Sequence, residues 1–237
     1  MVLILAGFVH GATKDLQIAA AANLSPVFPE LLAAFRQAHP GISVGVSFGA
    51  SALLVEQIRK GAPFDVLLAA SPEYADYLDP AIVRSRTTFA IGRLVLYIPK
   101  HTGVALYRLD TLENSRIRKV AVANPLHAPY GKAAIAALKH AGLYERIKHK
   151  IIYAANASQA AQMTIHGADA GLIPLSSALH PALRDSGNYW LIPSELHPPL
   201  EQIAVLLNDS RPARDFFDFL ASRKAREILS RHGFEEQ

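Results

Sequence analysis

The sequence contains no cysteine among its 237 residues, so disulfide bonds, thiolate metal sites and a cysteine nucleophile are excluded. This absence fits either a reducing cytosol or an exported protein built without crosslinks. Charged residues make up only 19%, and 24 Lys and Arg against 20 Asp and Glu leave a formal charge of +4. Binding a phosphate backbone needs a far more concentrated basic face, so we expect no nucleic-acid partner. The length suits one large domain or two small ones.

Long apolar runs are also absent, because no segment approaches the roughly 18 uninterrupted apolar residues of a membrane-spanning helix. A short apolar run, Val2–Val9, precedes His10 and the first charge at Lys14. We interpret residues 1–12 as the remnant of a secretory signal peptide. Against this, no basic residue precedes the run and His10 is bulky for a cleavage site. A poorly ordered chain start is the alternative.

Motifs for catalysis and cofactor binding are largely missing. No two of the ten His are three to five residues apart, and there is no phosphate loop or Gly-x-Gly-x-x-Gly, so we predict no metal site and no cofactor. The segment Gly49-Ala50-Ser51-Ala52 resembles a nucleophile elbow without its second glycine. Asp169 and His197 could complete a triad with Ser51 in the right order, but a triad is recognised by its geometry and not by the order of its residues. We expect no enzyme, with a serine hydrolase using Ser51 as an alternative.

What the sequence does contain is a regular alternation of short apolar runs with helical patterns. This alternation predicts an α/β fold with mixed, mainly parallel sheets. The expected strands are 16–20, 42–48, 66–69, 119–123, 151–155, 169–174, 189–192 and 203–207. The expected helices begin at the Ser25-Pro26 cap, at 52, at the Ser71-Pro72 cap, at 131, at 158 and at Ser210, the last continuing to Leu229.

One long extended segment, 89–99, has Gly92 in its middle, where a bend costs little. We therefore expect the chain to cross into a second lobe here and to return later, which gives two lobes joined by a two-strand hinge. The predicted first lobe comprises 13–90 plus 205–237, and the second comprises 91–204. A ligand would lie between them.

Four expected strand-to-helix junctions combine tiny residues with a hydroxyl or an amide. They are Ala20-Ala21-Ala22-Asn23-Leu24-Ser25, Gly49-Ala50-Ser51-Ala52, Asn124 to Gly131 with Tyr130 inside it, and Asn156-Ala157-Ser158. Such junctions lie at the carboxyl ends of strands, where ligands of open α/β sheets bind and helix N-termini offer free N–H groups. For each junction alone, ordinary helix capping is the competing interpretation. Together, two from each lobe, they predict a site for a small anion.

The junctions also limit which anion can bind. None of them contains Asp or Glu, so a protonated oxyanion such as hydrogen phosphate would find no carboxylate to accept its proton. Lys132 is the only cation nearby. We therefore expect neutral O–H and N–H donors to bind a fully ionised oxyanion.

Several short segments follow one another along the chain in a characteristic order. They are Ala20-Ala21-Ala22-Asn23-Leu24, Ser47 to Ala52, Gln57 to Val66, Ile91 to Leu96, Asn124-Pro125, Ala128 to Gly131, Ala155 to Ala160, and Gly167 to Gly171. In this order they resemble the periplasmic molybdate-binding proteins, the substrate-binding components of molybdate ABC importers. The resemblance runs from Leu16 to the C-terminal helix. It implies a two-lobed type 2 periplasmic binding protein that closes over its anion.

The resemblance also implies which residues bind. Carried over by motif, they are Ala22, Asn23, Ser51, Tyr130 and Ala157. One branch of the family uses a tyrosine at the Tyr130 position; the commoner branch has its tyrosine where this chain has Pro174, so Tyr130 is the expected donor. The implied ligand is molybdate, with tungstate alongside it, and the implied partner is an ABC permease. We expect a monomeric periplasmic protein, with sulfate or another tetrahedral oxyanion as the alternative ligand.

Overall fold

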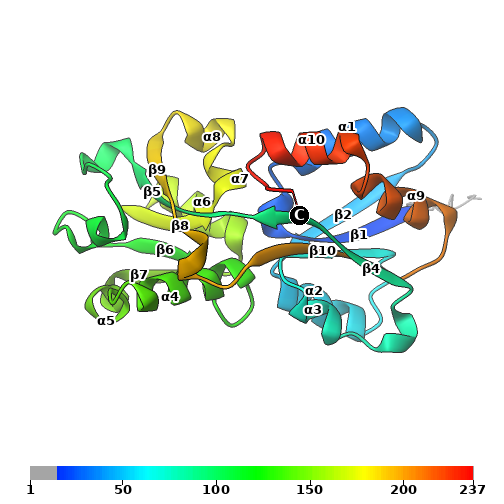
Figure 1. Cartoon of the computed structure of the whole chain (residues 1–237), viewed down its shortest axis with the longest axis horizontal. Coiled ribbons are helices and arrows are strands. Elements are labelled where there is room, and N and C mark those ends of the chain that lie inside the picture. Colours follow the sequence, from blue (N-terminus) through cyan, green and yellow to red (C-terminus); the bar gives the residue numbers. More distant parts are fainter. Residues whose placement is uncertain (1–14, 237) are drawn as a thin grey trace, which may run out of the picture.

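The computed structural model describes residues 15–236, so the interpretation of residues 1–12 lies outside the described chain. Two five-stranded sheets form separate lobes that lie side by side (Figure 1). The sheet of the first lobe has the order β2-β1-β3-β10-β4, and the sheet of the second lobe has the order β7-β6-β8-β5-β9. Within residues 15–236, none of the helices combines the length and apolar character needed to span a bilayer.

The first lobe is a three-layer sandwich. Its strands are β1 Leu16–Ala21, β2 Val44–Gly49, β3 Val66–Ala69, β4 Ser85–Gly92 and β10 Leu200–Leu206. One face is covered by α1 Phe28–Ala38, α9 Arg211–Leu220 and α10 Arg223–Arg231, and the other by α2 Ser51–Arg59 and α3 Glu73–Asp76 (Figure 1). Side chains of β1 alternate between the two faces: Ile18 packs in the first core and Ala19 in the second.

The second lobe repeats this plan. Its strands are β5 Leu94–Pro99, β6 Val120–Ala123, β7 Ile151–Ala154, β8 Ala170–Pro174 and β9 Gly187–Leu191. Its helices are α4 Pro129–His140, α5 Tyr144–Ile147, α6 Ala157–His166, α7 Leu175–Ala178 and α8 Pro181–Arg184. Side chains of β5 again alternate: Leu96 packs in the core beneath α4, and Val95 in the core beneath α6.

Both sheets are mixed, as expected, but each has as many antiparallel strand pairs as parallel ones. In each lobe three strands pair in parallel, and one strand, β10 in the first lobe and β5 in the second, pairs antiparallel with both of its neighbours. The helix-connected βα units give the parallel part. The antiparallel pairs all involve the strand by which the chain enters the lobe from the other one.

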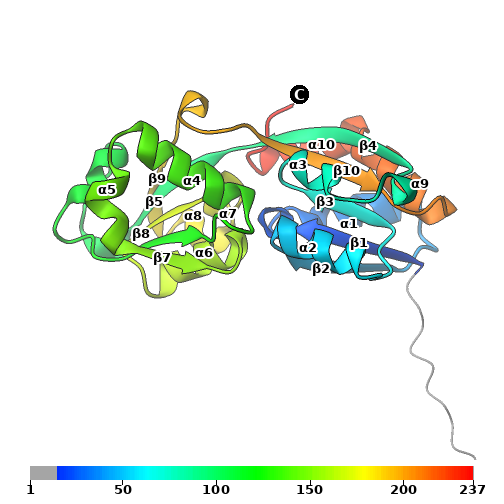
Figure 2. The ribbon, with the colours of Figure 1, turned by 90° about the horizontal axis from the view of Figure 1, so that it is seen from below.

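The lobes are linked by two chain crossings on the same side of the molecule (Figure 2). The first crossing lies at Arg93, between β4 and β5, close to the expected position. The second crossing precedes β10, because the whole of Leu200–Leu206 pairs with β3 and β4 of the first sheet. The expected boundary between 204 and 205 therefore falls inside a strand of the first lobe.

Two helix predictions were wrong. The first helix begins at Phe28 rather than at the Ser25-Pro26 cap, because the 3-10 helix η1, Ala22–Leu24, and a turn occupy the residues after β1. The predicted C-terminal helix is two helices, α9 and α10. It breaks at Ala221 because the Ser222 hydroxyl accepts a hydrogen bond from Ala225 N–H and caps a new helix.

Candidate functional site

All five residues predicted to bind line one small cavity between the lobes. Its walls come from the four predicted junctions together with the end of β3. The lining residues are Ala21, Ala22, Asn23, Gly49, Ala50, Ser51, Ala70, Ala128, Pro129, Tyr130 and Ala157. The sheets face each other through the carboxyl ends of their parallel strands, which explains why residues far apart in sequence meet here.

Helix N-termini surround the cavity. Ser51 is the first residue of α2, Tyr130 the second of α4 and Ala157 the first of α6. N–H groups in the first turn of a helix have no partner inside the helix, and the helix dipole makes this end positive. The cavity therefore lies where three helices offer backbone donors to an anion.

The Tyr130 hydroxyl is buried and makes no hydrogen bond to the described residues. Its side chain is 2% exposed, and its oxygen has no hydrogen-bond partner in the part of the chain that the structure describes. Burial raises the pKa of the Tyr130 phenol well above its ordinary value, and the nearby Asn23 side chain offsets only part of this rise. Tyr130 is consequently a neutral O–H donor at physiological pH.

Asn23 and Ser51 are buried and partly satisfied. The Asn23 amide Nδ2 donates to Gln202 Oε1 at 2.8 Å, which leaves a second N–H on the same nitrogen. The Ser51 hydroxyl oxygen accepts a hydrogen bond from Ala70 N–H at 3.2 Å, which leaves its own proton to donate. Each residue thus retains one donor at the cavity.

The cavity is uncharged and narrow. None of the described residues that line it has a formal charge. The space open to the centre of a water-sized sphere is about 10 Å³, room for roughly one water molecule. A four-oxygen anion needs more room than this, so the cavity would have to widen to hold one.

Several contacts between the lobes close the cavity. The Ser176 hydroxyl donates to Asn23 O at 2.8 Å, and Ala52 N–H donates to His127 O at 3.2 Å. Lys132, two residues after Tyr130, donates to Glu73 Oε1 of the other lobe at 2.5 Å and does not line the cavity. Burial lowers the pKa of Lys132, but Glu73 and Tyr74 more than offset this, so the net shift is upward.

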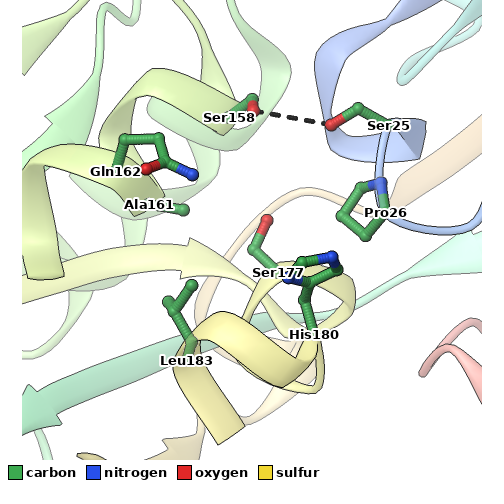
Figure 3. Close-up of a pocket in the computed structure, with 8 residues that line it drawn as sticks. All are labelled: Ser25, Pro26, Ser158, Ala161, Gln162, Ser177, His180 and Leu183. Atoms are coloured by element: carbon green, nitrogen blue, oxygen red, sulfur yellow. Dashed lines mark hydrogen bonds between the residues drawn. The ribbon is translucent and has the colours of Figure 1, made fainter. Parts of the chain in front are cut away.

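A second, larger cavity lies beside the first, also between the lobes. It measures about 140 Å³ and is lined by Ser25, Pro26, Ser158, Ala161, Gln162, Ser177, His180 and Leu183 (Figure 3). The Ser25 hydroxyl donates to the Ser158 hydroxyl across the lobes at 3.4 Å. None of the five predicted binding residues lines this cavity.

Comparisons with known proteins point to one family. Residues 16–235 match the family described as bacterial extracellular solute-binding protein. The chain is 33% identical to the molybdate-binding protein ModA of Azotobacter vinelandii, over 93% of this chain and 89% of the relative. It is 31% identical to the ModA of Rhodobacter capsulatus, over 99% of this chain and 93% of the relative. The solved periplasmic molybdate-binding protein of A. vinelandii superposes with a TM-score of 0.85 at 29% identity, covering 94% of this chain and all of the other.

The chain belongs to the bacterial extracellular solute-binding proteins. Two α/β lobes, two crossings and a cavity between the lobes give a solute-binding protein a way to enclose its ligand. The relatives named above are molybdate-binding proteins, and the serine-hydrolase interpretation gains no support from the geometry. Asp169 accepts hydrogen bonds from the N–H groups of Arg118 and Lys119, and neither Asp169 nor His197 is among the described residues that line the cavity with Ser51.

Three residues of this solute-binding protein were missed by sequence reasoning. Gln202 and Ser176 both hydrogen-bond to Asn23, and Gly92 packs directly on Tyr130, because a Cβ at Gly92 would collide with the hydroxyl oxygen. The only signal for Gln202 is a polar residue inside an apolar strand. Ser176 follows a strand, as the predicted site residues do, but it lies in a short helix that was not predicted.

Proposed function

We propose that this solute-binding protein binds molybdate, or tungstate in its place, in the uncharged cavity between its lobes. The Tyr130 hydroxyl is the observation on which this proposal mainly depends. A buried donor without a partner is costly, and an anion in the cavity would remove that cost. Relatives named as molybdate-binding proteins support the choice of anion.

In this proposal the anion is bound by neutral donors only. Tyr130, Ser51 and Asn23 offer side-chain protons, while Ala22 and Ala157, which also line the cavity, can offer only backbone N–H groups. Hydrogen bonds from neutral groups to an anion are strong where water is excluded and the donors are fixed in advance. Because the lining offers no carboxylate, a hydrogen phosphate would leave its proton unpaired.

Binding would favour the closed arrangement of the lobes. Asn23 and Ser51 belong to the first lobe, and Tyr130 and Ala157 to the second, so the anion makes its full set of contacts only when both lobes approach. A ligand with such differential contacts shifts the population towards the closed state. Opening would then release the anion.

The physiological role that follows is delivery rather than catalysis. The protein would act as a monomer in the periplasm and would pass the anion to the membrane permease of an ABC importer. The family to which the chain belongs, and the ModA relatives, support this role. Residues lining the cavity include no group suited to act as a general base at neutral pH.

Isothermal titration calorimetry of the whole protein tests the proposal. Molybdate, tungstate, sulfate and phosphate are titrated separately at the same pH and ionic strength. We expect tight binding of molybdate and tungstate, weaker binding of sulfate and no measurable binding of phosphate. Sulfate binding more tightly than molybdate would make this a sulfate receptor, and tight phosphate binding without molybdate binding would overturn the proposal.

A further inference from the structure

Gln202 is a fully buried polar residue in the strand that returns to the first lobe. Its exposed fraction is 0%, and its neighbours Ile203, Ala204 and Val205 on β10 are buried and apolar. A β-bulge shifts the register with β4 between Gln202 and Ile203. Bulges commonly redirect a side chain near a functional site. A buried amide is also expensive unless hydrogen bonds satisfy it.

The hydrogen bonds of Gln202 fix which way its amide points. Nε2 donates to Leu200 O at 2.7 Å, and Oε1 accepts from Asn23 Nδ2 at 2.8 Å. A backbone carbonyl oxygen can only accept, so the nitrogen must face Leu200. The oxygen must then face Asn23, and Asn23 must present its own nitrogen. The orientation of the Asn23 amide is thus set by the Leu200 carbonyl, to which it is linked through two successive hydrogen bonds.

This chain of hydrogen bonds lies at the crossing between the lobes. Leu200 pairs with Gly92, the last residue of β4 before the first crossing. A Cβ at Gly92 would come within 3.0 Å of Gln202 Nε2 and would collide with the Tyr130 hydroxyl oxygen. Gln202 therefore lies where Asn23 of the first lobe, Tyr130 of the second and the crossing strands meet.

We propose that Gln202 is a positioning residue that makes Asn23 a hydrogen-bond donor to the anion. The inference rests on the proposed function. With one N–H of Asn23 bound to Gln202, the second N–H of the same nitrogen is the group offered at the cavity. A reversed Asn23 amide would instead present its oxygen there and would repel an oxyanion. Position 202 must therefore supply both a donor for Leu200 O and an acceptor for Asn23.

The variant Gln202→Glu tests this requirement because its protonation can be controlled. A protonated Glu keeps both hydrogen bonds, since its O–H donates to Leu200 O and its C=O accepts from Asn23. An ionised Glu cannot donate to Leu200 O, and it adds a negative charge near the anion. Burial raises carboxyl pKa values, which brings this titration towards neutral pH.

The measurement is molybdate affinity by calorimetry between about pH 6 and pH 8.5. For Gln202→Glu we expect weak binding at the higher pH that recovers by up to about tenfold for each pH unit on acidification. Gln202→Leu should bind weakly at every pH, and the wild type should show no such dependence. Gln162→Glu is a control for added charge at an exposed position, because it lies beside the neighbouring cavity and has no hydrogen bond to Asn23. We expect its pH profile to be flat.

The outcomes separate the two proposals. A wild type that does not bind molybdate contradicts the proposed function itself. A wild type that binds, with a Gln202→Glu variant that binds equally well or whose loss is independent of pH, overturns the role of Gln202 alone. A purely structural role would lower the unfolding temperature of the ligand-free protein without any pH-dependent affinity.

A measurement on the wild type guards against a variant that fails to fold. Side-chain amide signals of Asn23 and Gln202 are followed by NMR as molybdate is added. We expect a large shift of the Asn23 NH₂ protons, and Gln202 NH₂ protons that are slow to exchange with and without the anion. Unshifted Asn23 protons, or Gln202 protons that exchange rapidly, would contradict the proposal.

Discussion

The Ser176 hydroxyl of the second lobe donates a hydrogen bond to the backbone oxygen of Asn23 in the first lobe, at 2.8 Å. Both residues are buried. The side chain of Asn23 lines the cavity, so one residue takes part both in joining the lobes and in forming the proposed site. Closure and anion binding are therefore linked through Asn23.

Removing this contact should weaken binding through the closed state. Ser176→Ala loses one buried hydrogen bond, worth about 1 kcal/mol, and this bond forms only when the lobes are together. We expect molybdate affinity to fall about fivefold. Ser177→Ala, the next residue and equally buried, lines the neighbouring cavity and should change the affinity little. Calorimetry that finds equal affinities for the two variants would contradict the link.

Tyr130→Phe should change stability and binding in opposite directions. Without ligand it removes a buried hydroxyl that has no partner, so we expect the free energy of unfolding to rise by about 1 kcal/mol. With ligand it removes a donor, so molybdate binding should weaken by about 1 to 3 kcal/mol. Chemical denaturation and calorimetry measure the two effects.

Tyr97→Phe is the matched control for this prediction. The Tyr97 hydroxyl is also buried, but it donates to Leu183 O at 2.6 Å, away from the cavity. Its loss leaves a carbonyl oxygen unpaired, so stability should fall and affinity should stay the same. A Tyr130→Phe variant that behaves like Tyr97→Phe would remove Tyr130 from the proposed site.

The raised pKa of Tyr130 predicts the effect of alkaline pH. Because the folded-state pKa lies above the ordinary value of 10.0, the unfolded chain loses this proton first as the pH rises. The folded state therefore loses stability relative to the unfolded chain as the pH rises above 10, and is unaffected by this group below that pH. Molybdate affinity should accordingly be constant between about pH 6 and pH 9. An affinity that drops near pH 8 in the wild type, and not in Tyr130→Phe, would mean that the Tyr130 phenol ionises there, which contradicts the prediction.

Ser51 offers a test that separates binding from catalysis. Ser51→Ala should weaken molybdate binding by about 1 to 3 kcal/mol, because the anion loses a donor. Ser177→Ala, which lines the neighbouring cavity, should leave the affinity unchanged. An acyl-directed serine probe should not label the wild type. Labelling at Ser51 would favour the hydrolase alternative.

Much of the fold could be predicted because local sequence and tertiary structure agree. Strand 66–69 was predicted with its observed bounds, and the preceding helix, predicted to begin at 52, begins at Ser51. The location of the cavity was predictable for a related reason: short strand-to-helix junctions place tiny residues and hydroxyls at one edge of each sheet. The five residues themselves were chosen by the family resemblance. Their gathering in one cavity is observed, and their role as anion donors remains a prediction.

The errors arose where contacts between residues far apart in the sequence determine the local structure. Ser25 and Pro26 have the composition of a helix start, but η1 continues the turn towards the cavity and delays α1 to Phe28. The return strand begins at Leu200 because β10 pairs with both β3 and β4, which no local pattern shows. Gln202 was missed for the same reason, since its partner Asn23 lies 179 residues earlier in the chain.

The position of the bound anion tests the proposed function most directly, and a crystal structure of the protein grown with molybdate would locate it. The anomalous signal of molybdenum identifies its position independently of the surrounding density. We predict one strong peak in the small cavity, with the Tyr130 and Ser51 hydroxyls and an Asn23 N–H directed at the oxyanion. A peak in the neighbouring cavity beside Ser177 and His180, or no peak between the lobes, would contradict the account.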